Sequence, residues 1–200
     1  MISDIFVVTG FGLFEPIFAI FINDNIIGGS IFAAGLASTI FIVVKSVLQL
    51  PIARYVDSHD HKMKLLIAGV FFISLVPFIY IFSDHIYMIY LAQVVYGIGA
   101  AFATPTWLGI WSTHLDKKKE AFEWSVYSTC VGLGGAASAT IGAAISEFIS
   151  FKITFLIVGC LSLLGMFILF ALEKDETRKL TIKSAYYHKV RKEHISKITE

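Results

Sequence analysis

The stretch GFGLFEPIFAIF, residues 10–21, places a glutamate followed by a proline in the middle of a long apolar run. A helix on the surface of a soluble protein keeps one polar face, whereas nearly every face of this stretch is apolar. Its surroundings are therefore either a large protein core or lipid, and Glu15 needs a physical reason to be there.

The composition of the whole chain favours lipid. Hydrophobic residues make up 56% of the 200 residues, charged residues 16%, and the mean hydropathy is +0.76, whereas soluble domains carry about 25% charged residues. About 20 helical residues cross a bilayer, and apolar stretches of that order recur along the chain. They predict six transmembrane helices, over residues 5–22, 28–53, 65–82, 86–113, 124–146 and 153–172. A soluble helical protein is the weaker alternative, because such runs leave no face for solvent.

Lysine and arginine are concentrated on one side of these helices. Three lie in the connection at 54–64, three at 114–120 and eight in the tail at 174–200, against only Lys152 in the connections at 23–29, 83–85 and 147–152. Because positively charged connections stay in the cytoplasm, we expect a plasma-membrane protein with both termini cytoplasmic. The basic tail is either an amphipathic helix on the inner leaflet or the start of a linker to further helices.

The two halves of the chain share short matches in the same order. These are GFGLFEP (10–16) with GIGAAFATP (97–105), LASTI (36–40) with ASATI (137–141), and LIAG (66–69) with LIVG (156–159). A three-helix unit crosses the membrane an odd number of times, so its second copy is inverted, as in secondary transporters. The fold class predicted is an all-α membrane protein of two inverted three-helix repeats.

The connection between the second and third helices carries a recognisable motif. The stretch ARYVDSHDHKMKL (53–65) resembles the motif Gly-x-Leu-x-Asp-Arg-x-Gly-Arg-Arg-x-x-Leu of the major facilitator superfamily. Asp57, Lys62 and Leu65 fit, Ala53 and His61 are conservative departures, and Ser58 and Asp60 replace an arginine and a glycine. The fourth helix carries QVVYGIG (93–99), with Gln93 where the family often has arginine, and the fifth has Gly142 without the proline of the drug antiporters.

This resemblance covers residues 1–173 and implies a six-helix bundle that is half of the family's twelve-helix fold, followed by the tail at 174–200. It also implies a cytoplasmic gate formed by Ala53, Asp57, His61 and Lys62. In that gate, Asp57 is held by the N-terminus of a neighbouring helix or by basic residues.

Six helices instead of twelve leave two explanations. The chain is either a natural half that pairs with itself or one half of a longer or split transporter. In the family, the second and fifth helices of each half meet the other half, and both are rich here in the small residues that allow close helix contact. We therefore expect a parallel homodimer with contacts at Ala34, Ser38, Gly134 and Ala137; packing within one bundle is the alternative.

Glu15 lies eight residues inside Asn23, about 12 Å from the outer edge at about 1.5 Å per residue. An ionisable residue at that depth is a functional candidate, and Pro16 directly after it weakens the helix. Lys45 reaches a similar depth from the other side and is a candidate partner. The hypothesis is that Glu15 and Lys45 couple transport to protons; a static structural pair is the alternative.

Other polar or aromatic residues at depth are candidates for a substrate cavity. They are Gln49, one turn from Lys45, together with Gln93 and Trp107. Trp107 with Trp111 could instead anchor the helix at the membrane interface.

No enzyme motif is present in the sequence: it contains no Gly-x-Ser-x-Gly, His-Glu-x-x-His, P-loop or Cys-x-x-Cys. We expect no enzymatic activity, cofactor, metal site or nucleic-acid partner. Two functions remain. The first is a proton-coupled carrier of a small solute, with membrane lipid, solute and protons as partners. The second is a non-transporting membrane module, or a half that needs a different partner half.

Overall fold

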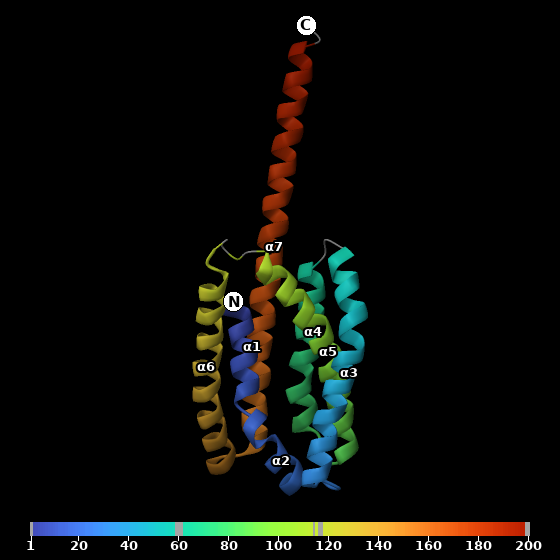
Figure 1. The fold of residues 1–200 in the computed structure, drawn as a ribbon, viewed down its shortest axis with the longest axis vertical. Coiled ribbons are helices and arrows are strands. Elements are labelled where there is room, and N and C mark those ends of the chain that lie inside the picture. Colours follow the sequence, from blue (N-terminus) through green and yellow to red (C-terminus); the bar gives the residue numbers. More distant parts are fainter. Residues whose placement is uncertain (1, 59–61, 114, 116–117, 199–200) are drawn as a thin grey trace.

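The computed structural model describes residues 2–58, 62–113, 115 and 118–198, and the side chains of residues 7–58, 62–113, 115 and 118–174. These residues form an elongated helical bundle (Figure 1). Its elements are α1 (Ile2–Gly12), the 3-10 turn η1 (Glu15–Ile17), α2 (Phe18–Asn25), α3 (Ile31–Ser58), α4 (Lys62–Ile81), α5 (Ile86–Ser112), α6 (Glu120–Phe148) and α7 (Phe151–Ile198).

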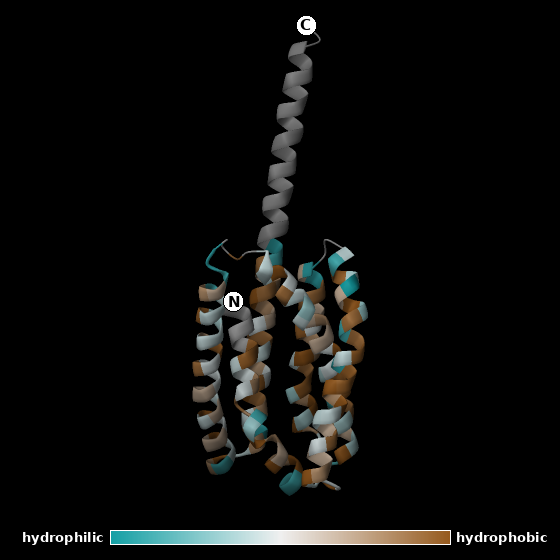
Figure 2. Cartoon of the chain, in the orientation of Figure 1, coloured by the Kyte–Doolittle hydropathy of each residue, from teal (hydrophilic) through white to brown (hydrophobic). Residues whose placement is uncertain are grey.

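Six segments of the described chain are long and apolar enough to cross a membrane. They are Val7–Asn25, Ile31–Ser58, Lys62–Ile81, Ile86–Ser112, Glu120–Phe148 and Phe151–Lys174. Hydrophobic residues extend along the length of these helices, and hydrophilic ones gather at the ends of the bundle (Figure 2). The prediction of a six-span, multi-pass membrane protein is confirmed.

The first span, predicted over residues 5–22 with a weak point at Pro16, is broken at the glutamate–proline pair. α1 ends at Gly12, η1 begins at Glu15 with Pro16 at its start, and α2 begins at Phe18. Proline has no N–H to extend the helical hydrogen-bond ladder. The Ile17 N–H instead donates to the carbonyl of Phe14, at 3.0 Å. Glu15 therefore lies at the start of a short turn between two helices.

The main helix contacts follow a pattern that recurs in the two halves of the chain. The first span packs against α6 and α7, α5 packs against α3 and α4, and α4 packs against α7. Exchanging the first span with α5, α3 with α6, and α4 with α7 converts these contacts of the first span into those of α5 and leaves the contact between α4 and α7 unchanged. The arrangement is consistent with two inverted three-helix repeats, and it leaves α3 and α6 at opposite edges of the bundle (Figure 1).

Close backbone contact joins α4 to α5. A Cβ on Gly69 would lie 2.8 Å from the carbonyl oxygen of Gly99, and a Cβ on Gly99 would lie 2.8 Å from the carbonyl oxygen of Gly69. Two glycines facing each other allow this approach, because no side chain separates the backbones. The crossing holds α5 against α4, and another face of α5 lines the site described below.

Both ends of the chain lie toward one end of the bundle, as an even number of spans requires (Figure 1). The expected boundary near residue 173 is not a helix boundary. α7 runs through Ile198 as one helix, so residues 174–198 continue the sixth span. The side chains of residues 175–200 lie outside the described part of the chain, and the amphipathic character of the tail stays a prediction.

Candidate functional site

A cavity of about 440 Å³ lies inside the bundle, walled by the first span and by α3, α4, α5, α6 and α7. Most of its wall is apolar, from side chains such as Val7, Val70 and Ile73. Its polar, charged and aromatic lining consists of Phe11, Glu15, Phe41, Lys45, Tyr96, Thr104, Trp107, Trp124 and Tyr127. A mostly apolar cavity with a few polar groups is the usual form of a small-molecule site.

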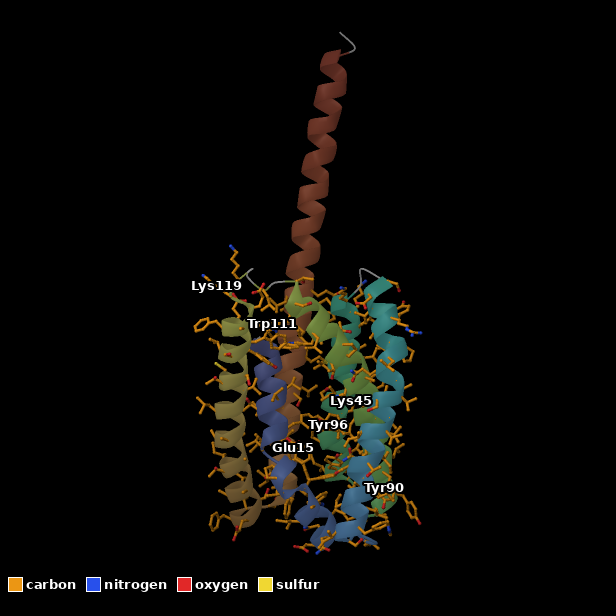
Figure 3. All side chains as sticks on the ribbon, in the orientation of Figure 1. Glu15, Lys45, Tyr90, Tyr96, Trp111 and Lys119 are labelled. Atoms are coloured by element: carbon orange, nitrogen blue, oxygen red, sulfur yellow. The ribbon has the colours of Figure 1, made fainter. Side chains whose placement is uncertain are left out.

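Glu15 and Lys45 are the two acidic or basic side chains among the described lining residues. The helix break carries Glu15 to the cavity from the first span, and Lys45 reaches it from the middle of α3. Figure 3 shows both residues near the middle of the bundle's length, and in this view Tyr96 lies between them. Neither side chain forms an ion pair or a hydrogen bond with another described residue. Glu15 and Lys45, which were expected to pair, therefore line the same cavity without a direct bond between them.

Tyr96 is the middle ring of a stack of three rings. Its ring centroid lies 4.8 Å from that of Phe11 and 4.3 Å from that of Phe41, with interplanar angles of 22° and 23°. Phe11 lies four residues before Glu15, ahead of the helix break, and Phe41 precedes Lys45 by one turn of α3. The Lys45 Nζ lies 6.0 Å from the centroid of the Phe41 ring, within the range of a cation–π contact.

A second aromatic cluster forms the wall of the cavity near the start of α6. The rings of Trp107 and Trp111 stack, with centroids 5.6 Å apart and planes 8° apart. Tyr127 of α6 lies 4.8 Å from Trp107, and Trp124 lies 6.1 Å from it, both between ring centroids. These rings join α5 to α6, two helices whose other contacts are sparse. Trp107 thus lines the cavity and also packs against Trp111, and its part in solute binding stays a prediction.

Two of the expected cavity residues do not line it. Gln93 is buried, at 4% exposure, and its Nε2 donates a hydrogen bond to the Tyr80 Oη at 3.0 Å. It joins α5 to α4 in the core. Gln49 lies one turn beyond Lys45 on α3, but it is not part of the cavity wall. One turn along a tilted helix is enough to carry a side chain past the end of a cavity.

The sequence reasoning missed Tyr96, Trp124 and Tyr127. Tyr96 lies three helical turns before Trp107 on the same face of α5, with Ala100 and Thr104 between them. Helical spacing counted back from Trp107 places Tyr96 on the same face, so the sequence contained a signal for it. Trp124 and Tyr127 lie near the start of α6, and their inward direction depends on the packing of α6.

The residues expected at a dimer contact divide into two groups. Ala34 is buried within its own chain, at 4% exposure, because the alanine face of α3 packs inward together with Ala33 and Ala37. It leaves little surface for a second copy, and its place in a dimer contact stays a prediction. Ser38 and Ala137 are exposed, and Gly134 is half-buried.

The expected gate residues lie at the end of the bundle that holds both termini. Asp57 is exposed near the end of α3, Ala53 and Lys62 are half-buried, and His61 lies outside the described residues. Asp57 forms no hydrogen bond or ion pair with another described residue. Within the described chain, it is therefore not held by a neighbouring helix or by a basic side chain as expected, and its role in a gate stays a prediction.

Comparison with known families supplies the wider context. The sequence model of the Major Facilitator Superfamily matches residues 1–197. No curated protein matches the chain. The family match extends from α1 through the long α7.

Proposed function

Because the chain belongs to the Major Facilitator Superfamily, whose members are transporters, we propose that it is a secondary active transporter of a small solute, coupled to protons. The solute binds in the cavity between the first span, α3 and α5. Glu15 binds the coupling proton, and Lys45 modulates that binding from α3.

The observation that carries this proposal is the position of Glu15. It lies at a break in a membrane-spanning helix, on the wall of a cavity, with no ion pair to Lys45 across that cavity. An isolated charge near the middle of a bilayer costs at least about 2.5 kcal/mol. A carboxyl group avoids this cost by taking up a proton, which is the change that a proton-coupled cycle requires.

Lys45 gives the cycle a means of moving that proton. A cation close to a carboxyl group favours its ionised form, and withdrawal of the cation favours the protonated form. Glu15 and Lys45 belong to different spans, which meet mainly through α2 and α3. A shift of α3 against the first span would therefore change their separation and drive proton uptake and release.

A complete pathway needs a second wall, and we propose that a second copy of the chain supplies it. α3 and α6 bury the smallest shares of their apolar segments and lie at opposite edges of the bundle (Figure 1). A parallel two-fold pair would place α3 of one copy against α6 of the other, twice over. A different six-helix partner would use the same two edges.

The orientation proposed follows from the charges. The basic connections and the tail lie at the end of the bundle that holds both termini, and we assign that end to the cytoplasmic side of the plasma membrane.

The test uses the full chain reconstituted in liposomes with an imposed proton gradient. A transporter will accumulate its solute with proton movement that depends on the solute. Solute-independent proton movement, or none with any solute of a broad panel, would favour a non-transporting membrane module. Activity that appears only after addition of a different half-transporter would favour the split-transporter alternative.

A further inference from the structure

We infer that the cavity binds a small zwitterionic solute with an apolar middle, whose cationic end lies at Glu15 and whose anionic end lies at Lys45. This inference rests on the proposed function, since it takes the cavity as the solute site, and it adds the chemical class of the solute.

The described cavity wall presents one carboxylate and one ammonium group, and neither forms an ion pair or a hydrogen bond within the described chain. When a carrier occludes its solute, water is excluded, and a charge left without a partner is strongly unfavourable. A cationic or neutral solute would leave the Lys45 ammonium unpaired, and an anionic solute would pair with Lys45 but leave the Glu15 carboxylate unpaired until it takes up a proton. A solute with both charges pairs with each group.

Phe11, Tyr96 and Phe41 form a stack with successive centroid distances of 4.8 and 4.3 Å. Its outer rings belong to the segments that carry the charges, since Phe11 lies four residues before Glu15 and Phe41 lies four residues before Lys45. The two charged residues therefore come from the segments at opposite ends of this stack. A solute that reaches both needs its own charges separated by several bonds, as in an ω-amino acid or a short peptide.

The rest of the cavity wall includes Tyr96 and apolar side chains such as Val70 and Ile73. An alkyl or aromatic spacer buries apolar surface there. Glu15 holds the cation of the solute as a carboxylate and the proton as a carboxyl, so solute and proton alternate at one residue.

The chain contains its own reporter for this test. All three of its tryptophans, Trp107, Trp111 and Trp124, belong to the aromatic cluster beside the cavity. Binding to the purified full chain in lipid nanodiscs is therefore measured by intrinsic tryptophan fluorescence. The probes are aminohexanoate, hexylamine and hexanoate, which share a length and differ in charge, together with the matching butyl and octyl sets.

We expect aminohexanoate, or its butyl or octyl counterpart, to bind at least about tenfold more tightly than the matching amine and acid, since each missing charge pair weakens binding by more than 1.4 kcal/mol. Glu15→Gln should abolish this preference and leave the acid as the tightest probe. Lys45→Gln should leave the amine as the tightest. Gln49→Ala, one turn away on α3 and off the cavity wall, should keep the wild-type order.

A general loss of folding would weaken all probes equally, so the reversal of their order is the decisive reading. The exchanged variant Glu15→Lys/Lys45→Glu, which restores one charge of each sign, should regain the preference for the zwitterion. An unchanged order in the single variants, equal binding of the three probes, or no binding by any probe of the three lengths overturns the inference.

Failure of this inference and failure of the transport proposal give different results. A switch of probe order without solute-dependent proton movement in liposomes leaves the zwitterion site standing and rejects transport. Proton-driven accumulation of a neutral or singly charged solute, with no zwitterion preference in nanodiscs, rejects the site and keeps transport.

Discussion

The carbonyl group of Leu13 lies against Gly142 of α6, in the space that a Cβ on Gly142 would occupy. Leu13 is the first residue after α1, so this contact is made where the first span is broken. The edge helix α6 thus packs directly on the segment that presents Glu15 to the cavity. A change in this contact should therefore alter the position of Glu15 in the cavity.

Gly142→Ala should destabilise the protein by about 1–3 kcal/mol, because the added methyl group overlaps the Leu13 backbone and one of the two helices must shift. Thermal unfolding of the purified protein in detergent measures the change. Gly132→Ala on the same helix is the matched control, since a Cβ there meets nothing within 4 Å. Equal stability of the two variants would show that the contact at Leu13 is loose.

Gln93→Leu should lower stability by about 1–3 kcal/mol, because it leaves the buried Tyr80 hydroxyl without its hydrogen-bond partner. The double variant Gln93→Leu/Tyr80→Phe removes both polar groups and should recover most of the loss. A double-mutant cycle in thermal or chemical unfolding measures the coupling. Transport by the double variant should stay near wild type, because neither residue lines the cavity. Loss of transport in this variant would indicate that Gln93 or Tyr80 takes part in solute binding.

Glu15→Gln should reduce proton-driven solute accumulation by about tenfold or more, because the amide cannot take up and release a proton at this depth. Uptake into liposomes against a solute gradient is the measurement. Glu147→Gln makes the same chemical change at an exposed position off the cavity wall and should leave uptake unchanged. Accumulation at the wild-type rate by the Glu15 variant would make this residue structural.

Asp57→Asn should shift the carrier toward the inward-facing state. Asp57 is exposed and has no partner among the described residues, so we expect its partner in the second half of the assembly. Loss of the charge should increase maleimide labelling, from the cytoplasmic side, of a cysteine that replaces Leu108 on the cavity wall. Asp84 is exposed in the connection between α4 and α5, at the opposite end of the bundle, and Asp84→Asn should not increase this labelling. Equal labelling of the two variants would contradict a role for Asp57 in the gate.

Cysteines at Ser38 and Ala137 should be joined between two copies by a short bifunctional maleimide, because both positions are exposed on the edge helices α3 and α6. Cross-linking in native membranes followed by gel electrophoresis detects the dimer. A cysteine at Ala34, buried within the chain at 4% exposure, combined with the one at Ala137, is the control and should give monomers. Monomers from both pairs would count against the homodimer.

The sequence by itself determined the number of spans and the place where the first is interrupted. Span length is a local property, because a run of apolar residues either is or is not long enough to cross the hydrocarbon core. The break at residues 13–17 is likewise tied to a local cause, the proline directly after Glu15. The motif at residues 53–65 and the order of the helices were sufficient to indicate the family.

Only the tertiary structure decided which way each side chain points. In a soluble protein, the polar face of a helix indicates how the helix is rotated about its own axis. These helices are apolar on every face, so their sequences carry little information about that rotation. The rotation is set by close contacts such as Gly69 with Gly99. That is why Gln93 lies in the core against Tyr80, why Ala34 faces its own bundle, and why Tyr96 lines the cavity together with Glu15 and Lys45.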